Sequence, residues 1–254
     1  MTVKKPDMIE KFIPKNKYSR PGTKRKKTTK IAWHYTGQAE VKAINTVKYF
    51  TNVVGSGYKV NGKNIYASSH FVVGLDGEIY YIVPVGEVAY TTNQANSYSI
   101  GVECATTGKD DHYTDAEYKA MVKLGAWLAT EYNLDPREDF IRHYDVTGKI
   151  CPRYFVNNKK AWEQFKLDCY NAMHTAQIKN NVDYNSKAKV VCDKALNVRK
   201  ARPEGNKLAE VIDSITDSTI VTLGYVINNW GSIYYLKDGV IRSGFVNVKY
   251  LELL

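Results

Sequence analysis

Residues 142–152 read Arg-His-Tyr-Asp-Val-Thr-Gly-Lys-Ile-Cys-Pro, which places His143 and Cys151 eight residues apart. The residues just before this stretch, from Asp139 to His143, predict a short strand that reaches a loop. Imidazole nitrogens and thiolate sulfurs are preferred ligands of zinc in proteins. The stretch therefore holds two candidate metal ligands close to the end of one strand.

A second histidine ends another predicted strand. Residues 30–35 read Lys-Ile-Ala-Trp-His-Tyr, and Thr36 and Gly37 break this strand pattern just after His34. Two imidazoles and one thiolate fill three corners of a tetrahedron and leave the fourth for water, as a catalytic zinc requires. The spacing alone is a weak signal, because a histidine at a strand end more often has a structural role.

The segments around these residues alternate between strand and helix patterns. Helices are expected over about 38–52, from Thr114 to Tyr132 and from Asn157 or Asn158 onward; strands are expected over 30–35, 99–104 and 139–143, with a hairpin over 68–83 that turns at Asp76-Gly77. Thr114 and Glu117 fit the capping box that opens a helix. The alternation predicts an α/β or α+β domain over residues 31–175, with a mixed central sheet and flanking helices.

The rest of the chain has a different pattern. Residues 176–187 are polar and predict a linker. Beyond them, within 188–254, short strand-like runs cover 189–192, 196–199, 219–226, 232–236 and 244–248. Such runs between Gly, Asn and Asp turns predict a small all-β barrel.

Most of the positive charge lies in the first thirty residues. Residues 1–30 hold eleven Lys or Arg and two acidic residues, so this N-terminal arm carries +9 of the formal net charge of +10. Such an arm attracts polyanions such as teichoic acid; the alternative is an arm that packs along the domain with its lysines in solvent. Because the other residues carry only +1, no nucleic-acid partner is expected.

The sequence shows neither a secretion signal nor a membrane span. No apolar run follows the basic residues of the arm, and no stretch is long enough to cross a bilayer. A product made in the cytoplasm is therefore expected. Cys104, Cys169 and Cys192 show no CxxC spacing and are expected to be small core residues.

Several segments together resemble the type 2 N-acetylmuramoyl-L-alanine amidases, a family that includes many phage endolysins and is related to peptidoglycan recognition proteins. The resemblance rests on Trp33-His34-Tyr35-Thr36, Ala67–Val73, Ser99–Glu103, Arg142–Pro152 and the leader Ile13–Gly22. The segment Arg142–Pro152 is the most specific of these.

The resemblance implies a zinc ion held by His34, His143 and Cys151. It also implies an acid–base role for Glu103 and a place for Lys149 beside the substrate. The expected reaction is hydrolysis of the amide between the muramic acid lactyl group and L-alanine of bacterial peptidoglycan. A phage endolysin that acts at the cell wall after synthesis in the host cytoplasm is the leading interpretation. The alternative is a non-catalytic peptidoglycan-binding protein on the same fold, although such relatives typically lose the cysteine ligand.

The sequence departs from the wider family at one position. Ser69 stands where members place a catalytic tyrosine, just before His70. A tyrosine-assisted mechanism is therefore not expected, and the acid–base role falls to Glu103. Tyr66 lies nearby in sequence, and His70 either orients a ligand or is structural.

The C-terminal segment resembles the bacterial SH3-like cell-wall-binding domains. The resemblance rests on Ala195–Arg199 and Gly244–Leu251. It implies that this domain anchors the enzyme to the wall, which raises the effective concentration of the catalytic domain on its polymer.

Overall fold

The structure is a computed structural model, and it describes residues 3–174, 178–192 and 194–254. The chain divides into two compact units, Met1–His174 and Thr175–Leu254. Each unit has hydrophobic clusters of its own, and each is described separately below.

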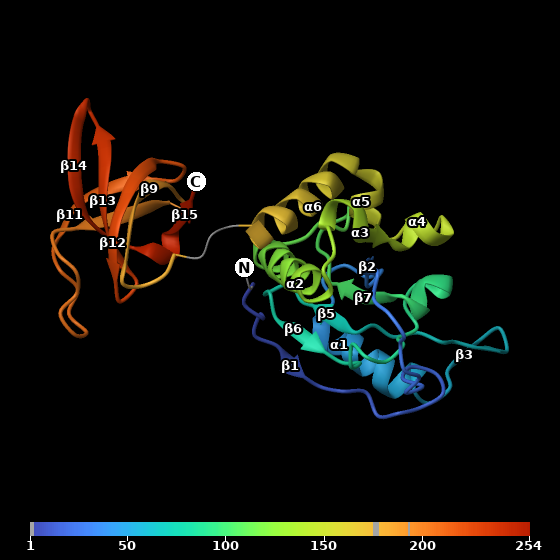
Figure 1. Ribbon diagram of the computed structural model, residues 1–254. Helices are drawn as coiled ribbons and strands as arrows, with labels where there is room; N and C mark the ends of the chain where they lie inside the picture. Colours follow the sequence, from blue (N-terminus) through green and yellow to red (C-terminus); the bar gives the residue numbers. More distant parts are fainter. Residues whose placement is uncertain (1–2, 175–177, 193) are drawn as a thin grey trace. The chain divides into compact units, whose positions relative to one another are not determined.

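The N-terminal unit is built on a six-stranded mixed sheet in the order β1-β6-β5-β7-β2-β8 (Figure 1). Its strands are β1 (Ile9–Glu10), β2 (Lys30–Tyr35), β5 (Phe71–Val73), β6 (Ile79–Tyr81), β7 (Ser99–Cys104) and β8 (Phe140–Arg142). The pair β5–β6 is the predicted hairpin and is antiparallel. The pairs β5–β7, β7–β2 and β2–β8 are parallel. A small separate hairpin pairs β3 (Lys59–Val60) with β4 (Lys63–Asn64).

Helices cover both faces of this sheet, so the unit has three layers (Figure 1). On one face, α2 (Asp115–Tyr132) and α6 (Lys159–His174) pack with the sheet around Trp33, Phe71 and Leu128, which are fully buried. On the other face, α1 (Ala43–Lys48) and the π-helical turn Tyr49–Val54 enclose a second cluster. The short helix α3 (Pro136–Asp139) connects α2 and β8, and the short helices α4 (His143–Thr147) and α5 (Arg153–Asn157) connect β8 and α6.

Two helix boundaries differ from the prediction. The helix expected over 38–52 begins only at Ala43, because Glu40 has a positive φ of 63° that an α-helix does not accommodate. His143 does not end a strand but opens α4, since the Asp145 carboxylate accepts the Arg142 N–H at 2.8 Å and starts a helix there. At α6, the Asn158 carboxamide oxygen accepts the Ala161 N–H, so the expected asparagine cap is at Asn158.

The helix α2 forms only half of the predicted capping box. The Thr114 hydroxyl oxygen accepts the Glu117 N–H at 3.1 Å, as the motif requires. The Glu117 carboxylate does not return to the Thr114 backbone; it is fully buried, and neither of its oxygens has a hydrogen-bond partner among the described residues. Burial raises the pKa of Glu117 to about 9.

This buried carboxyl group is expected to make stability fall as pH rises. An unfolded chain releases the Glu117 proton near pH 4.5, whereas the folded chain keeps it until about pH 9. The contribution of protonated Glu117 to the free energy of unfolding is therefore complete below about pH 4.5. It declines toward pH 9, by up to about 1.4 kcal/mol per pH unit. Glu117→Gln removes this dependence. Urea unfolding of both proteins at pH 5, 7 and 8.5 measures the difference, and parallel stability profiles would contradict the assignment.

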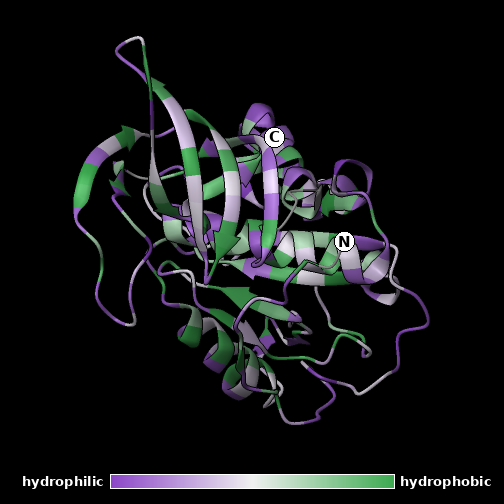
Figure 2. Ribbon diagram, turned by 60° about the vertical axis from the view of Figure 1, so that its left-hand side comes forward, coloured by the Kyte–Doolittle hydropathy of each residue, from purple (hydrophilic) through white to green (hydrophobic). Residues whose placement is uncertain are grey.

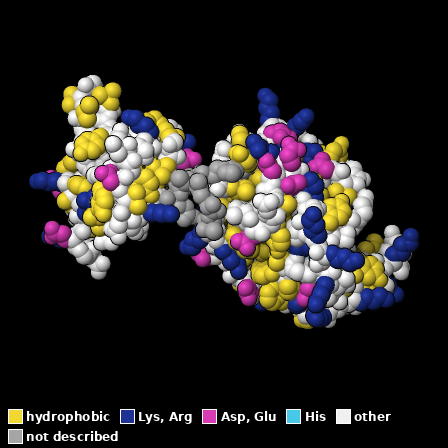
Figure 3. All heavy atoms as spheres, in the orientation of Figure 1, with side chains coloured by type: hydrophobic (Ala, Val, Ile, Leu, Met, Phe, Trp, Pro, Cys, Tyr) yellow, Lys and Arg dark blue, Asp and Glu magenta, His cyan; other side chains and the backbone are white. Residues whose placement is uncertain are grey.

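The N-terminal arm packs along its own unit. Strand β1 pairs with β6, and Ile13 is fully buried in the cluster beneath α1. Arg20 forms an ion pair with Glu87 at 2.8 Å. Lys and Arg side chains are spread over the face of this unit that Figure 3 shows, with Asp and Glu between them. Part of the arm is therefore structural, and its attraction to teichoic acid stays a prediction.

The C-terminal unit is a curled antiparallel sheet that is compatible with an SH3-like fold. Its strands are β9 (Val182–Val190), β10 (Ala195–Arg199), β11 (Val211–Thr216), β12 (Ile220–Ile227), β13 (Trp230–Lys237), β14 (Val240–Asn247) and β15 (Leu251–Leu253), in the order β11-β10-β14-β13-β12-β9-β15. Hydrophobic and hydrophilic residues alternate along the longer strands (Figure 2), which gives the sheet one buried face.

Strand β9 overlaps the stretch that was predicted to be a linker. It begins at Val182, because residues 182–190 pair with β12, so only part of 176–187 is outside a strand. Residues 176 and 177 of that stretch, and the predicted domain end at 175, lie outside the described residues. Within the described ranges, no helix has the length and apolar character needed to cross a membrane.

Candidate metal centre and adjoining cavity

Three parallel strands bring candidate residues to one edge of the N-terminal sheet. Strand β2 lies between β7 and β8, and its His34 is in register with Glu103 of β7. On the other side Trp33 is in register with Arg142, so His143 is the next residue at the end of β8. Because parallel strands end at the same edge, residues that lie far apart in sequence meet there.

A tight turn after α4 brings Cys151 back to the same edge. Helix α4 ends at Gly148, which has a φ of +76° that suits glycine. The Tyr144 N–H, which is unpaired within the first turn of the helix, donates to the Cys151 carbonyl oxygen at 3.0 Å. The eight-residue spacing therefore corresponds to one short helix and its return.

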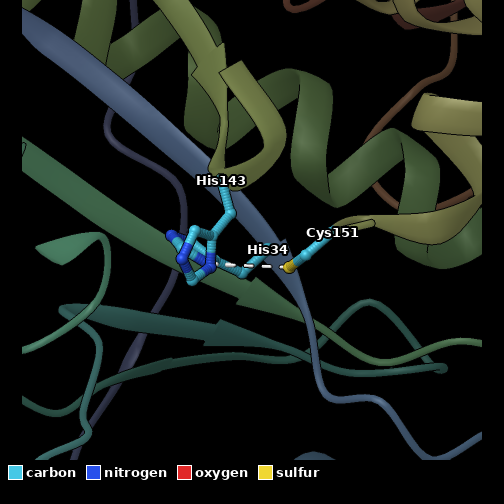
Figure 4. A group of neighbouring side chains, drawn as sticks. All are labelled: His34, His143 and Cys151. Carbon is cyan, nitrogen blue, oxygen red and sulfur yellow. Dashed lines mark hydrogen bonds between the residues drawn. The ribbon is translucent and has the colours of Figure 1, made fainter. Parts of the chain in front are cut away.

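His34, His143 and Cys151 point toward one another (Figure 4). Their ligand atoms all lie within 4.8 Å of one another, and the His34 Nδ1 is 3.7 Å from the Cys151 Sγ. The side chains are 2%, 8% and 2% exposed, respectively. Among the described residues, this is the single group of three or more His, Cys, Asp and Glu side chains that could hold a metal ion.

The geometry and the protonation of this group fit a metal ion. A tetrahedral ion with bonds of about 2.3 Å to sulfur and about 2.0–2.1 Å to nitrogen holds a nitrogen and a sulfur about 3.6 Å apart and two nitrogens about 3.3 Å apart. Burial lowers the pKa of His34 and lowers that of His143 to about 4, so both imidazoles are neutral and offer lone pairs. Burial raises the pKa of Cys151 to about 12, and a bound cation is what would favour its thiolate.

A cavity of about 390 Å³, with both polar and apolar side chains in its lining, adjoins this group. Glu103 and Lys149 line it together with Tyr35 at the end of β2, Asn45 of α1 and Tyr49 of the π-helical turn. The Glu103 Oε2 is buried and has no hydrogen-bond partner among the described residues. Burial raises the pKa of Glu103 to about 8, and the Lys149 ammonium opposes this rise.

One residue that contacts the group was not singled out in the sequence. The Thr92 hydroxyl lies 2.9 Å from the His34 Nε2, the ring nitrogen that faces away from Cys151. Thr92 is fully buried and is separated from His34 by 58 residues. No local pattern joins two such positions, so the contact is visible only in the fold.

His70 and Tyr66 lie outside the metal-ligand group. His70 is fully buried; its Nδ1 accepts the Gly101 N–H at 3.0 Å, and its Nε2 is 3.0 Å from the Glu87 carbonyl oxygen. These contacts tie strand β7 to the loop after β6, which is a structural role. Tyr66 is exposed and packs against the rings of Tyr18 and Tyr90.

Comparisons with solved structures identify the fold of the N-terminal unit. The catalytic domain of XlyA aligns with a TM-score of 0.50 at 24% identity and covers 65% of this chain and 99% of that chain. PlyL aligns with a TM-score of 0.53 at 22% identity and covers 65% of this chain and 97% of that chain. At these identities the likeness concerns the fold alone.

Sequence comparisons add a family and two curated relatives. The chain is 33% identical over 175 residues to the N-acetylmuramoyl-L-alanine amidase BlyA of Bacillus subtilis, which covers 61% of this chain and 44% of that protein. It is 30% identical over 171 residues to the N-acetylmuramoyl-L-alanine amidase CwlL of Bacillus licheniformis, covering 63% of this chain and 45% of that protein. The chain thus spans less than half the length of these relatives.

The matched region contains the whole candidate site. The profile of a family described as N-acetylmuramoyl-L-alanine amidase matches residues 24–154, about half of the chain. This range begins in the arm and ends just after Cys151, so it includes the three grouped side chains as well as Glu103 and Lys149. The chain therefore belongs to the N-acetylmuramoyl-L-alanine amidase family.

Proposed function

We propose that this protein is a zinc-dependent N-acetylmuramoyl-L-alanine amidase that cuts stem peptides from bacterial peptidoglycan. The observation that carries the proposal is the buried group of His34, His143 and Cys151 beside a cavity lined by Glu103 and Lys149. Family membership supports the bond that is cut, and the donor set of two imidazoles and one sulfur suits zinc. A phage origin and a role as an endolysin stay predictions from the sequence resemblance.

The metal ligands and the catalytic groups have separate tasks in this mechanism. When bound, zinc polarises the substrate carbonyl and makes water acidic enough to attack at neutral pH. His34, His143 and Cys151 would hold the ion at the end of the sheet, where all three side chains are buried. The carbonyl to be attacked is that of the lactyl group of muramic acid.

Glu103 and Lys149 move a proton and balance charge. Glu103 takes a proton as the water oxygen bonds to the carbonyl carbon, and it passes that proton to the alanine nitrogen as the C–N bond breaks. The exposed Lys149 ammonium lines the same cavity and faces the charge that develops on the carbonyl oxygen. The Lys149 ammonium opposes the effect of burial on the pKa of Glu103. It thereby favours the ionised form of this carboxyl group, which a base needs.

An end-group assay on purified peptidoglycan tests the proposal. An amidase releases new N-terminal alanine and creates no new reducing sugar, and a chelator should stop the release. New reducing ends would show a glycosidase instead. Robust wall binding with no amine release would favour the non-catalytic peptidoglycan-binding protein.

We further propose that the C-terminal unit anchors the enzyme to the wall, on the basis of its curled antiparallel sheet and its SH3-like sequence segments. A chain that ends at Asn180 keeps the N-terminal unit with its own clusters. It is expected to hydrolyse soluble muropeptides at the rate of the whole protein but to sediment less with intact walls, because the second binding unit is lost. Cosedimentation measures this difference, and equal binding by both chains would contradict an anchor.

A further inference from the structure

We propose that Thr92 is a positioning residue that fixes the tautomer of His34, so that Nδ1 offers its lone pair to the metal ion. The inference rests on the proposed role of His34 as a zinc ligand. The Thr92 hydroxyl oxygen lies 2.9 Å from the His34 Nε2, and both side chains are buried. The tautomer of His34 depends on which of these two atoms donates the hydrogen bond. The hydrogen bonds around Thr92 determine the donor.

The Asn96 carboxamide determines which groups donate and which accept in this set of hydrogen bonds. It accepts the backbone N–H of Thr91 at 2.9 Å and that of Thr92 at 2.6 Å through one atom. A backbone N–H can only donate, so the atom that receives both is the carboxamide oxygen and not the nitrogen. This oxygen is an acceptor only, and it provides a fixed end for the hydroxyl groups beside it.

Two threonine hydroxyls lead from this oxygen to the histidine. The Thr91 hydroxyl lies 3.5 Å from the Asn96 Oδ1 and 2.9 Å from the Thr92 hydroxyl. Because the Asn96 oxygen cannot donate, the Thr91 hydroxyl donates to it and accepts from Thr92. The Thr92 hydroxyl then donates its proton to the Thr91 oxygen. It can therefore only accept at His34, from the Nε2–H.

This hydrogen bond determines the state of the other ring nitrogen of His34, Nδ1. A neutral imidazole carries one proton, so a proton on Nε2 leaves Nδ1 with a free lone pair. Nδ1 is the atom that lies 3.7 Å from the Cys151 Sγ, inside the metal-ligand group. The threonine pair therefore selects the tautomer that can bind a metal, before any metal arrives.

The fold provides space for this arrangement at a glycine. Strand β7 has Gly101 beside Thr91, and a Cβ at that position would lie 2.3 Å from the Thr91 Cγ2. Only glycine lets the Thr91 side chain pack this closely against the strand. The short 3₁₀ helix Asn93–Ser97 then returns Asn96 to the two threonine N–H groups.

Substitutions at Thr92 separate the hydroxyl from the shape of the side chain. Thr92→Val keeps the branched shape and removes the acceptor, and it is expected to weaken zinc binding about 10–100-fold. Thr92→Ser keeps the hydroxyl and should bind zinc within a few-fold of the unchanged protein. Zinc affinity is measured by competition with a chelator at fixed pH. Thr106→Val is the matched control, because it removes a buried hydroxyl that bonds Asp111 and does not contact His34.

The tautomer itself provides a second readout that needs no substitution at Thr92. In the metal-free protein labelled with ¹⁵N-histidine, the His34 signals, assigned by their loss in His34→Gln, should show a proton on Nε2. A proton on Nδ1 would overturn the inference, as would wild-type zinc affinity in a folded Thr92→Val protein. If Cys151→Ser also kept full zinc affinity, the proposed function itself would fail. That result is distinct from failure at Thr92 alone.

Discussion

Replacing Cys151 with serine is expected to reduce amide hydrolysis to the background of the assay and to remove most bound zinc. A serine hydroxyl is a far poorer zinc ligand than a thiolate, and the site retains two imidazoles only. Loss of an outer partner of a ligand already costs about 10–100-fold in affinity, so the loss of a ligand should exceed about a hundredfold. Zinc content after dialysis and release of N-terminal alanine from walls measure the two effects.

Cys192 provides the matched control for this substitution. It is a partly exposed cysteine of the C-terminal unit, outside the metal-ligand group. Cys192→Ser should therefore keep both zinc and activity. Full activity and full zinc content in Cys151→Ser would remove Cys151 from the site, whereas equal losses in both variants would point to a general effect of thiol removal.

The sequence predicted the N-terminal fold well because its local signals agree with the tertiary structure. Apolar runs such as residues 30–35 and 99–104 are strands with both faces buried, and the Asp76-Gly77 turn joins the expected hairpin. Two of the candidate ligands were also visible, since His34 lies near the end of β2 and His143 directly follows β8. Their approach to one another was not visible, because it depends on which strands are neighbours.

Two C-terminal strands were missed for a similar physical reason. Strand β11 (Val211–Thr216) contains Asp213 and Ser214, and this polar pair interrupts the alternation expected of a strand. In the fold, Asp213 accepts hydrogen bonds from Tyr235 and Lys237, whose strand is distant in sequence. Strand β15 (Leu251–Leu253) has three residues, and its pairing with β9 defines it. The residues near β11 and β15 in sequence do not include the partners that define these two strands.

The polar network behind His34 shows the limit of sequence patterns most clearly. Thr91, Thr92 and Asn96 read as an ordinary polar loop, in which hydroxyl and amide side chains are common. Their role depends on the burial of Thr91 and Thr92 and on the contact of Thr92 with His34, 58 residues away. Glu117 is the opposite case: the sequence motif was correct about the helix start, but the carboxylate packs into the core instead of closing the box.

Replacing Glu103 with glutamine is expected to lower turnover about 10²–10⁴-fold while zinc binding stays intact. Glutamine keeps the size of the side chain but cannot take a proton, and general acid–base catalysis contributes about that factor. Glu103 lies beside the metal-ligand group but is not a member of it, so the ion should be retained. Single-turnover rates on a soluble muropeptide, together with zinc content, separate these effects. The loss should appear in kcat, with KM little changed.

Glu117→Gln is the matched control, because Glu117 is a second glutamate with a buried carboxylate oxygen that lacks a partner among the described residues. Glu117 lies on α2, whose apolar side chains share a core cluster with Cys104, and residues 103 and 104 point to opposite faces of strand β7. Glu117→Gln should therefore change the pH dependence of stability and leave turnover unchanged. Near-normal turnover in Glu103→Gln would remove Glu103 from the mechanism, and equal losses in both variants would mean that burial, not proton transfer, explains the effect. A selective loss at position 103 is the result that assigns the base, since the two variants share the same chemical change but Glu103 lines the cavity and Glu117 lies on α2.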